Sequence, residues 1–121
     1  MNKTFKIILG IVLVVFLFYL VMPKSDKAGI SGNFAKCLSD NGAKMYGASW
    51  CGACKKQKEI FGSSFKHVNY IECASSGGGQ SATCSSANIE AYPTWEFSDG
   101  SRTSSVLGVN QLAQLTGCSL E

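Results

Sequence analysis

The sequence predicts a small mixed α/β domain that follows one N-terminal hydrophobic helix. An unbroken apolar run occupies residues 7–22, and helical and strand patterns alternate through residues 33–117. The pair Asp99–Gly100 also marks a tight hairpin near the end of the chain. A chain of 121 residues has room for one small domain beside such a helix.

Residues 1–23 are predicted to form an uncleaved signal anchor. Lys3 and Lys6 precede the apolar run, which would extend about 24 Å as a helix and approach the roughly 30 Å core of a bilayer. The run is longer than the apolar part of a usual signal peptide, and residues 23–32 offer no cleavage site close to its end. A cleaved signal peptide is the alternative. Both interpretations export the rest of the chain.

The exported part is predicted to comprise a linker at residues 24–32 and a domain at residues 33–121. The linker is polar and contains glycine. All six cysteines lie in the domain, which fits a compartment where disulfides persist. The lysines are scattered and the net charge is only +3, so no nucleic-acid partner is expected.

Helices and strands alternate in the first half of the domain. Asn33 is a possible N-cap of the first helix, and Gly42 is a suitable stop. The predicted elements are a helix at 33–42, a buried strand at 43–49, a helix from Cys51 to at least Phe61, and an alternating strand at 67–73.

The second half is predicted to end with a hairpin and a helix. Ser81 is a plausible N-cap for a short helix that follows the glycine-rich loop at 74–80. The remaining elements are a strand at 93–98, the Asp99–Gly100 turn, a returning strand at 102–108 and a helix at 109–117. A helix between two strands implies parallel pairing, and the hairpin adds an antiparallel edge, so we expect a mixed sheet covered by helices.

Two cysteines separated by Gly52 and Ala53 carry the chemistry that the sequence predicts. Cys51 lies where a strand gives way to a helix, and free backbone N–H groups at a helix start stabilise a thiolate. Cys54 lies one turn later on the same face and can close a disulfide with Cys51. We therefore predict that Cys51 is the attacking thiol and that Cys54 is the resolving thiol.

Two other roles for this cysteine pair are less well supported. A zinc site needs a second pair of ligands, and the chain has no second C-x-x-C motif and only one histidine, His67. A purely structural bridge is also possible, but one this local removes little chain entropy. Neither a metal nor a cofactor is therefore expected.

Pro93 is a second candidate feature, because it begins the strand at 93–98. A cis Tyr92–Pro93 bond would expose the backbone N–H and C=O groups of Tyr92 to an extended substrate. The alternative is an ordinary trans proline that opens a strand.

The segment "SWCGACK", followed some forty residues later by "YPT", resembles the thioredoxin superfamily. A closer resemblance is to the thioredoxin-like domain that accompanies bacterial and plant vitamin K epoxide reductase homologues, and it covers residues 34–117. That resemblance is carried by the stretches "FAKCL", "GAKMYGASWC", "QKEIFG", "NYIEC", "YPTWEF" and "LAQLTG", in this order. It implies a trimmed thioredoxin-like fold in which the first strand of the family is absent.

The resemblance also implies roles for individual residues. Cys51 and Cys54 would be the redox pair, Tyr92–Pro93 a cis-proline substrate platform, and Trp50 the aromatic flank of the site. One departure is Met45, which stands where thioredoxin has a buried Asp that assists proton transfer.

The four remaining cysteines are expected to be structural. The resemblance implies that Cys73 and Cys84 form an extra pair across the glycine-rich loop. Cys37 and Cys118 would then either bridge the first helix to the C-terminal end or remain as two buried thiols.

The function that follows is a membrane-tethered protein-disulfide oxidoreductase that acts on cysteine-containing exported proteins. The resemblance implies electron exchange with a separate membrane protein of the vitamin K epoxide reductase type. It also implies a location on the exported side of a membrane, such as the periplasm or a compartment like the thylakoid lumen, and a soluble periplasmic or secreted protein if the signal is cleaved. The alternatives are a redox-inert binding module and a soft-metal-binding protein. The direction of electron flow stays open.

Overall fold

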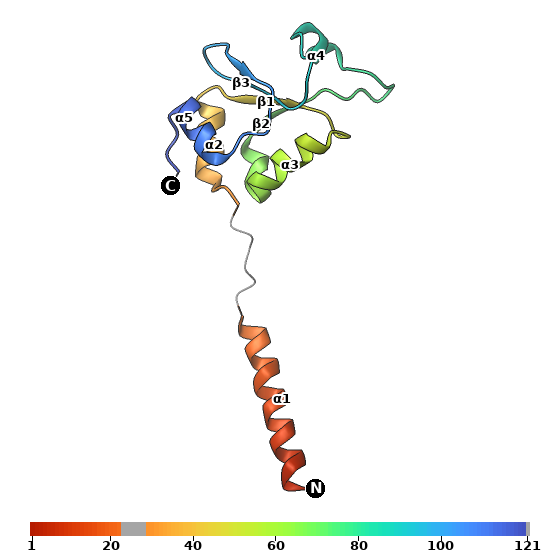
Figure 1. Ribbon diagram of the computed structural model, residues 1–121, viewed down its shortest axis with the longest axis vertical. Helices are drawn as coiled ribbons and strands as arrows, with labels where there is room; N and C mark the ends of the chain where they lie inside the picture. The colour runs from red at the N-terminus through yellow and green to blue at the C-terminus, as the bar shows by residue number, and fades with distance from the viewer. Residues whose placement is uncertain (23–28, 121) are drawn as a thin grey trace.

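The computed structural model describes residues 1–22 and 29–120 (Figure 1). Helix α1 (Lys3–Val21) contains 19 residues, and none of them is buried. Within the described residues it is the one helix whose length and composition would allow it to cross a membrane, although a signal sequence meets the same criteria. Most of the predicted linker lies outside the described residues.

The described residues of the domain form a four-stranded sheet in the order β2-β1-β3-β4. Strands β1 and β2 are parallel, whereas β3 pairs antiparallel with both β1 and β4. The prediction of a small mixed α/β domain is therefore confirmed, including the hairpin at Asp99–Gly100. The elements are α2 (Gly32–Asp40), β1 (Lys44–Gly47), α3 (Gly52–Phe61), the 3₁₀ helix η1 (Gly62–His67), β2 (Asn69–Glu72), α4 (Ala82–Ser86), β3 (Thr94–Glu96), β4 (Arg102–Thr103) and α5 (Val109–Thr116).

The start of α2 differs from its prediction. Ser31, and not Asn33, is the N-cap, because its side chain accepts a hydrogen bond from the backbone N–H of Phe34. The chain is already attached to the domain before this helix, since Ile30 donates a backbone hydrogen bond to the carbonyl of Ile60. The Ser81 cap of α4 is as expected, and its side chain accepts from the backbone N–H of Cys84.

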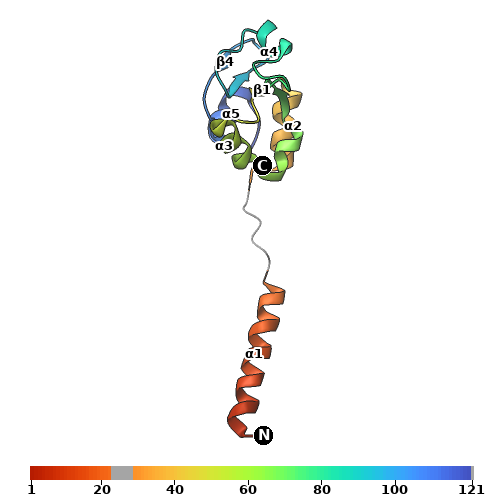
Figure 2. The same ribbon diagram turned by 90° about the vertical axis from the view of Figure 1, so that its right-hand side faces the viewer.

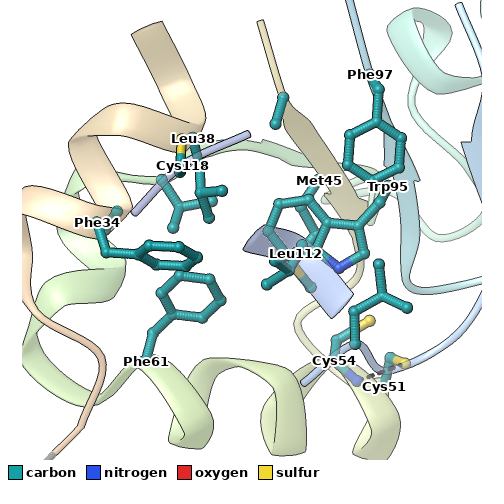
Figure 3. Packing of buried hydrophobic residues seen from close by; sticks show 14 of the residues in the cluster. Phe34, Leu38, Met45, Cys51, Cys54, Phe61, Trp95, Phe97, Leu112 and Cys118 are labelled. Atoms are coloured by element: carbon teal, nitrogen blue, oxygen red, sulfur yellow. Dashed lines mark hydrogen bonds between the residues drawn. The ribbon is translucent and has the colours of Figure 1, made fainter. Parts of the chain in front are cut away.

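The sheet separates two groups of buried side chains. Alternation along β1 places Met45 on one face, where it packs with residues of α2, α3 and α5, and Tyr46 on the other. Figure 3 shows the larger group, in which the side chains of Phe34, Phe61, Trp95 and Leu112 converge. The smaller group includes Cys84 of α4, which Figures 1 and 2 draw at the upper end of the domain.

All six cysteines lie within the described residues. Cys37 is bonded to Cys118, which joins α2 to the segment after α5, and Cys73 is bonded to Cys84, which joins the end of β2 to α4. Cys51 and Cys54 are free thiols.

Candidate active site

Cys51 begins helix α3 as its N-cap residue. Its Sγ accepts a hydrogen bond from the backbone N–H of Cys54 at 3.2 Å, which Figure 3 marks with a dashed line. The thiol also lies 3.7 Å from the carbonyl oxygen of Tyr92. A sulfur at this position faces the N–H groups of the first helical turn.

Cys54 is the inner partner of the pair. Its side chain has no exposed surface, whereas Cys51 retains 8% exposure. Burial, followed by the hydrogen bond to Cys51, raises the pKa of the Cys54 thiol to about 11. Cys54 therefore stays protonated at neutral pH, and the outer, helix-capping Cys51 is the thiol suited to meet another molecule.

The Tyr92–Pro93 peptide bond is cis. The carbonyl oxygen of Tyr92 lies beside the Cys51 thiol, and the ring of Pro93 is fully buried. The surface beside Cys51 is thus formed by the Tyr92 backbone and by Trp50, which is 72% exposed and meets the Tyr92 ring edge-on with centroids 5.8 Å apart. The structure therefore brings together the residues that the sequence singled out.

Gln80 supports the Tyr92 side chain, a role that the sequence does not predict. Its side-chain amide donates to the Tyr92 hydroxyl at 2.6 Å and to the carbonyl of Ile89 at 2.7 Å. Gln80 lies in the loop closed by the Cys73–Cys84 disulfide, so this loop supports the platform. No local pattern indicates such a contact, because the two residues are twelve positions apart and meet only in the fold.

Glu72 is a second residue that sequence analysis did not assign to the site. Its Oε1 accepts hydrogen bonds from the backbone N–H of Ser49 at 2.7 Å and of Ala74 at 3.1 Å. Ser49 lies just before the exposed Trp50, so Glu72 holds the segment that leads into α3. The only sequence pattern that points to Glu72 is the alternation of β2, which places it on the same face as Tyr70.

The described part of the chain contains no group of three or more His, Cys, Asp or Glu side chains that could hold a metal ion.

The chain is similar to part of a curated protein. No protein-family profile matches the chain. The chain is 42% identical over 92 residues to Thiol-disulfide oxidoreductase LTO1 of Arabidopsis thaliana. The match covers 72% of this chain but 24% of the relative, so the chain spans about a quarter of the length of that protein.

Proposed function

We propose that this chain is a protein-disulfide oxidoreductase that works through the Cys51–Cys54 pair. The observation that carries the proposal is the position of Cys51, capping α3 beside the Tyr92 carbonyl while Cys54 lies buried behind it. The similarity to part of a protein named a thiol-disulfide oxidoreductase supports the same chemistry.

The geometry fits dithiol–disulfide exchange in either direction. For oxidation, a substrate thiolate attacks Cys51 of the closed pair, and the electron pair of the broken bond leaves on Cys54. A second thiolate of the substrate then attacks the substrate sulfur that is bonded to Cys51. This step releases an oxidised substrate and leaves Cys51 and Cys54 reduced. For reduction, Cys51 attacks a substrate disulfide, and Cys54 then displaces the remaining substrate sulfur.

The Tyr92 carbonyl and the exposed ring of Trp50 would bind an extended substrate segment. A backbone carbonyl at the edge of a site can pair with a peptide in the manner of a strand, while the indole supplies apolar contact. We therefore propose cysteine-containing proteins, rather than small thiols, as the substrates of this chain.

The fold, the anchor and the partner complete the proposal. The element order fits a trimmed thioredoxin-like fold, and α1 has the length and hydropathy of a membrane anchor. We propose that α1 tethers the domain on the exported side of a membrane and that a separate membrane protein of the vitamin K epoxide reductase type exchanges electrons with it.

Trapping of mixed disulfides tests this function. In the full chain, Cys54→Ala should accumulate disulfide-linked adducts through Cys51, because the resolving thiol is missing. Their identification by mass spectrometry would name the substrates and the membrane partner. The double variant Cys51→Ser with Cys54→Ala is the matched control and should form none.

The main competing function is a redox-inert binding module, which the exposed Trp50 platform would also suit. Exchange with a model dithiol separates the two functions. Unchanged exchange in Cys51→Ser would contradict the oxidoreductase assignment.

A further inference from the structure

The resolving thiol has to lose its proton from a buried position. Cys54 is fully buried, and the pKa of about 11 that results from burial and from the Cys51 hydrogen bond leaves on the order of one thiol in ten thousand ionised at neutral pH. Attack by Cys54 on a mixed disulfide would therefore gain from a proton acceptor close to its sulfur. Met45, on the same face of the sheet, cannot serve as one.

The hydroxyl of Tyr70 lies near the Cys54 sulfur, across the space that a side chain at residue 47 would occupy. A side-chain Cβ built on Gly47 would stand 3.2 Å from the Sγ of Cys54 and 3.2 Å from the hydroxyl oxygen of Tyr70. Because residue 47 is glycine, no side chain of β1 separates the two atoms. The parallel register pairs Met45 with Tyr70 and Gly47 with Glu72, which brings all of these groups to one face.

Tyr70 is connected in turn to a carboxylate. Its hydroxyl donates to Oε2 of Glu72 at 2.5 Å, while Oε1 of the same carboxylate accepts from the backbone N–H groups of Ser49 and Ala74. Burial opposes ionisation of Glu72, but the bonds from Tyr70, Ser49 and Ala74 together lower its pKa below the ordinary value. Burial and the bond to Glu72 raise the pKa of Tyr70, which therefore remains a hydrogen-bond donor.

Among the described residues, the titratable groups that face this arrangement come from α3 with its N-cap residue and from β2. Helix α3 contributes Cys51, Cys54 and Lys58, and strand β2 contributes Tyr70 and Glu72. The Nζ of Lys58 stands 4.2 Å from the centroid of the Tyr70 ring, and its positive charge favours the ionised forms of both Cys54 and Glu72. Glu59, the next residue of α3, is exposed.

We propose that Tyr70 and Glu72 are the proton-accepting pair for Cys54, with Tyr70 relaying the thiol proton to the Glu72 carboxylate. The inference rests on the proposed function, since it concerns the resolving step of the same site. As the Sγ of Cys54 bonds to the Sγ of Cys51, the bond from Cys51 to the substrate sulfur breaks and its electron pair leaves with the substrate as a thiolate.

The proton follows a separate path in the same step. It passes from Cys54 to the oxygen of Tyr70 while the Tyr70 proton passes to Glu72, so the pair ends as a neutral tyrosine and a neutral carboxylic acid. Glu72 then returns the proton to solvent or to the departing thiolate. In the reverse reaction, Glu72 and Tyr70 reprotonate Cys54 as it leaves.

Stopped-flow reaction with 5,5′-dithiobis(2-nitrobenzoic acid) separates the two steps. The full chain in detergent, with Cys51 and Cys54 reduced and the other disulfides intact, should release one thionitrobenzoate when Cys51 attacks and a second when Cys54 resolves. The rate of the first phase depends on reagent concentration and that of the second does not. The second phase is followed as a function of pH in the wild type, Glu72→Gln and Tyr70→Phe.

Both variants should resolve at least about tenfold more slowly than the wild type at neutral pH, with the first phase unchanged. Their second phase should rise steeply with pH, so that the difference narrows as hydroxide ionises Cys54 directly. Gln at position 72 keeps an oxygen for Ser49 and Ala74, and Phe at position 70 keeps the ring under Lys58. Glu59→Gln removes a nearby exposed carboxylate and should match the wild type.

A second phase that is unaffected in either variant, or slowed by the same factor at every pH, would overturn the relay. The latter result would mean that the two residues only shape the site. Absence of the first phase from the wild type would instead show that the proposed function itself fails.

Discussion

Among single residues, Gly47 leaves a space between Cys54 and Tyr70 because it has no side chain. A methyl group there would meet Cε2 of Tyr70 at 2.9 Å and the Sγ of Cys54 at 3.2 Å. The backbone carbonyl of Gly47 also accepts a hydrogen bond from the N–H of Cys73, so the strand cannot easily move away. The space between Cys54 and Tyr70 therefore depends on glycine at this position.

Gly47→Ala should destabilise the protein by about 1–3 kcal/mol, because the added methyl overpacks a rigid part of the core. The free energy of unfolding from urea denaturation measures the loss. Gly77→Ala is the matched control, since nothing lies within 4 Å of a Cβ at that position. Equal stability of the two variants would contradict the close packing at Gly47.

At the scale of elements, Gln57 joins α3 to β3 and to the segment before α5. Its side chain is fully buried in the helix. The Oε1 accepts from the indole N–H of Trp95 and the backbone N–H of Leu107, and the Nε2 donates to the Leu107 carbonyl. These hydrogen bonds compensate for burying the Gln57 amide in an apolar core. They also fix α3, which begins at the Cys51 cap and contains Cys54, against the sheet.

Gln57→Ala should cost roughly 3 to 5 kcal/mol of unfolding free energy, since it leaves the polar groups of Trp95 and Leu107 buried without this partner and opens a cavity. Gln114→Ala, at an exposed position of α5, should change stability by less than about 0.5 kcal/mol. Thermal and chemical denaturation compare the two. A small effect at position 57 would mean that the surrounding groups find other partners.

At the scale of the whole molecule, two disulfides close loops of very different length. Cys37–Cys118 has a sequence separation of 81 and joins nearly the two ends of the domain, whereas Cys73–Cys84 has a separation of 11. Asn41 reinforces the first closure, because its side-chain amide donates to the Thr116 carbonyl at 3.0 Å and contacts the sulfur of Cys118 at 3.4 Å. A domain this small gains much of its stability from such links.

Removal of the long-range bridge by Cys37→Ala with Cys118→Ala should therefore cost more than removal of the short one. The chain-entropy relation gives about 4.5 kcal/mol for the first and about 3 kcal/mol for the Cys73→Ala and Cys84→Ala pair. Denaturation midpoints of the two double variants, measured without reductant, check the order. A larger loss of unfolding free energy for the Cys73 and Cys84 variant would contradict this order. It would show that the contact of this loop with Tyr92 through Gln80 contributes more than the chain entropy.

Sequence patterns predicted much of the local structure. The helix that Cys51 caps, the strands around it and the Asp99–Gly100 hairpin follow from hydrophobic periodicity and turn residues, which act over a few positions. The start of α2 lies two residues before the predicted cap, because the side chain of Ser31, and not that of Asn33, accepts a hydrogen bond from the first turn.

Local geometry alone predicts that two thiols stand one helical turn apart at the start of a helix. The groups that surround these thiols depend on how distant segments pack. The parallel register of β1 and β2 sets Tyr70, which binds Glu72, near Cys54. The Tyr92 carbonyl lies beside Cys51, and Gln57 turns inward to meet Trp95. Each of these contacts joins segments distant in the chain, so its energy depends on packing that no local pattern encodes.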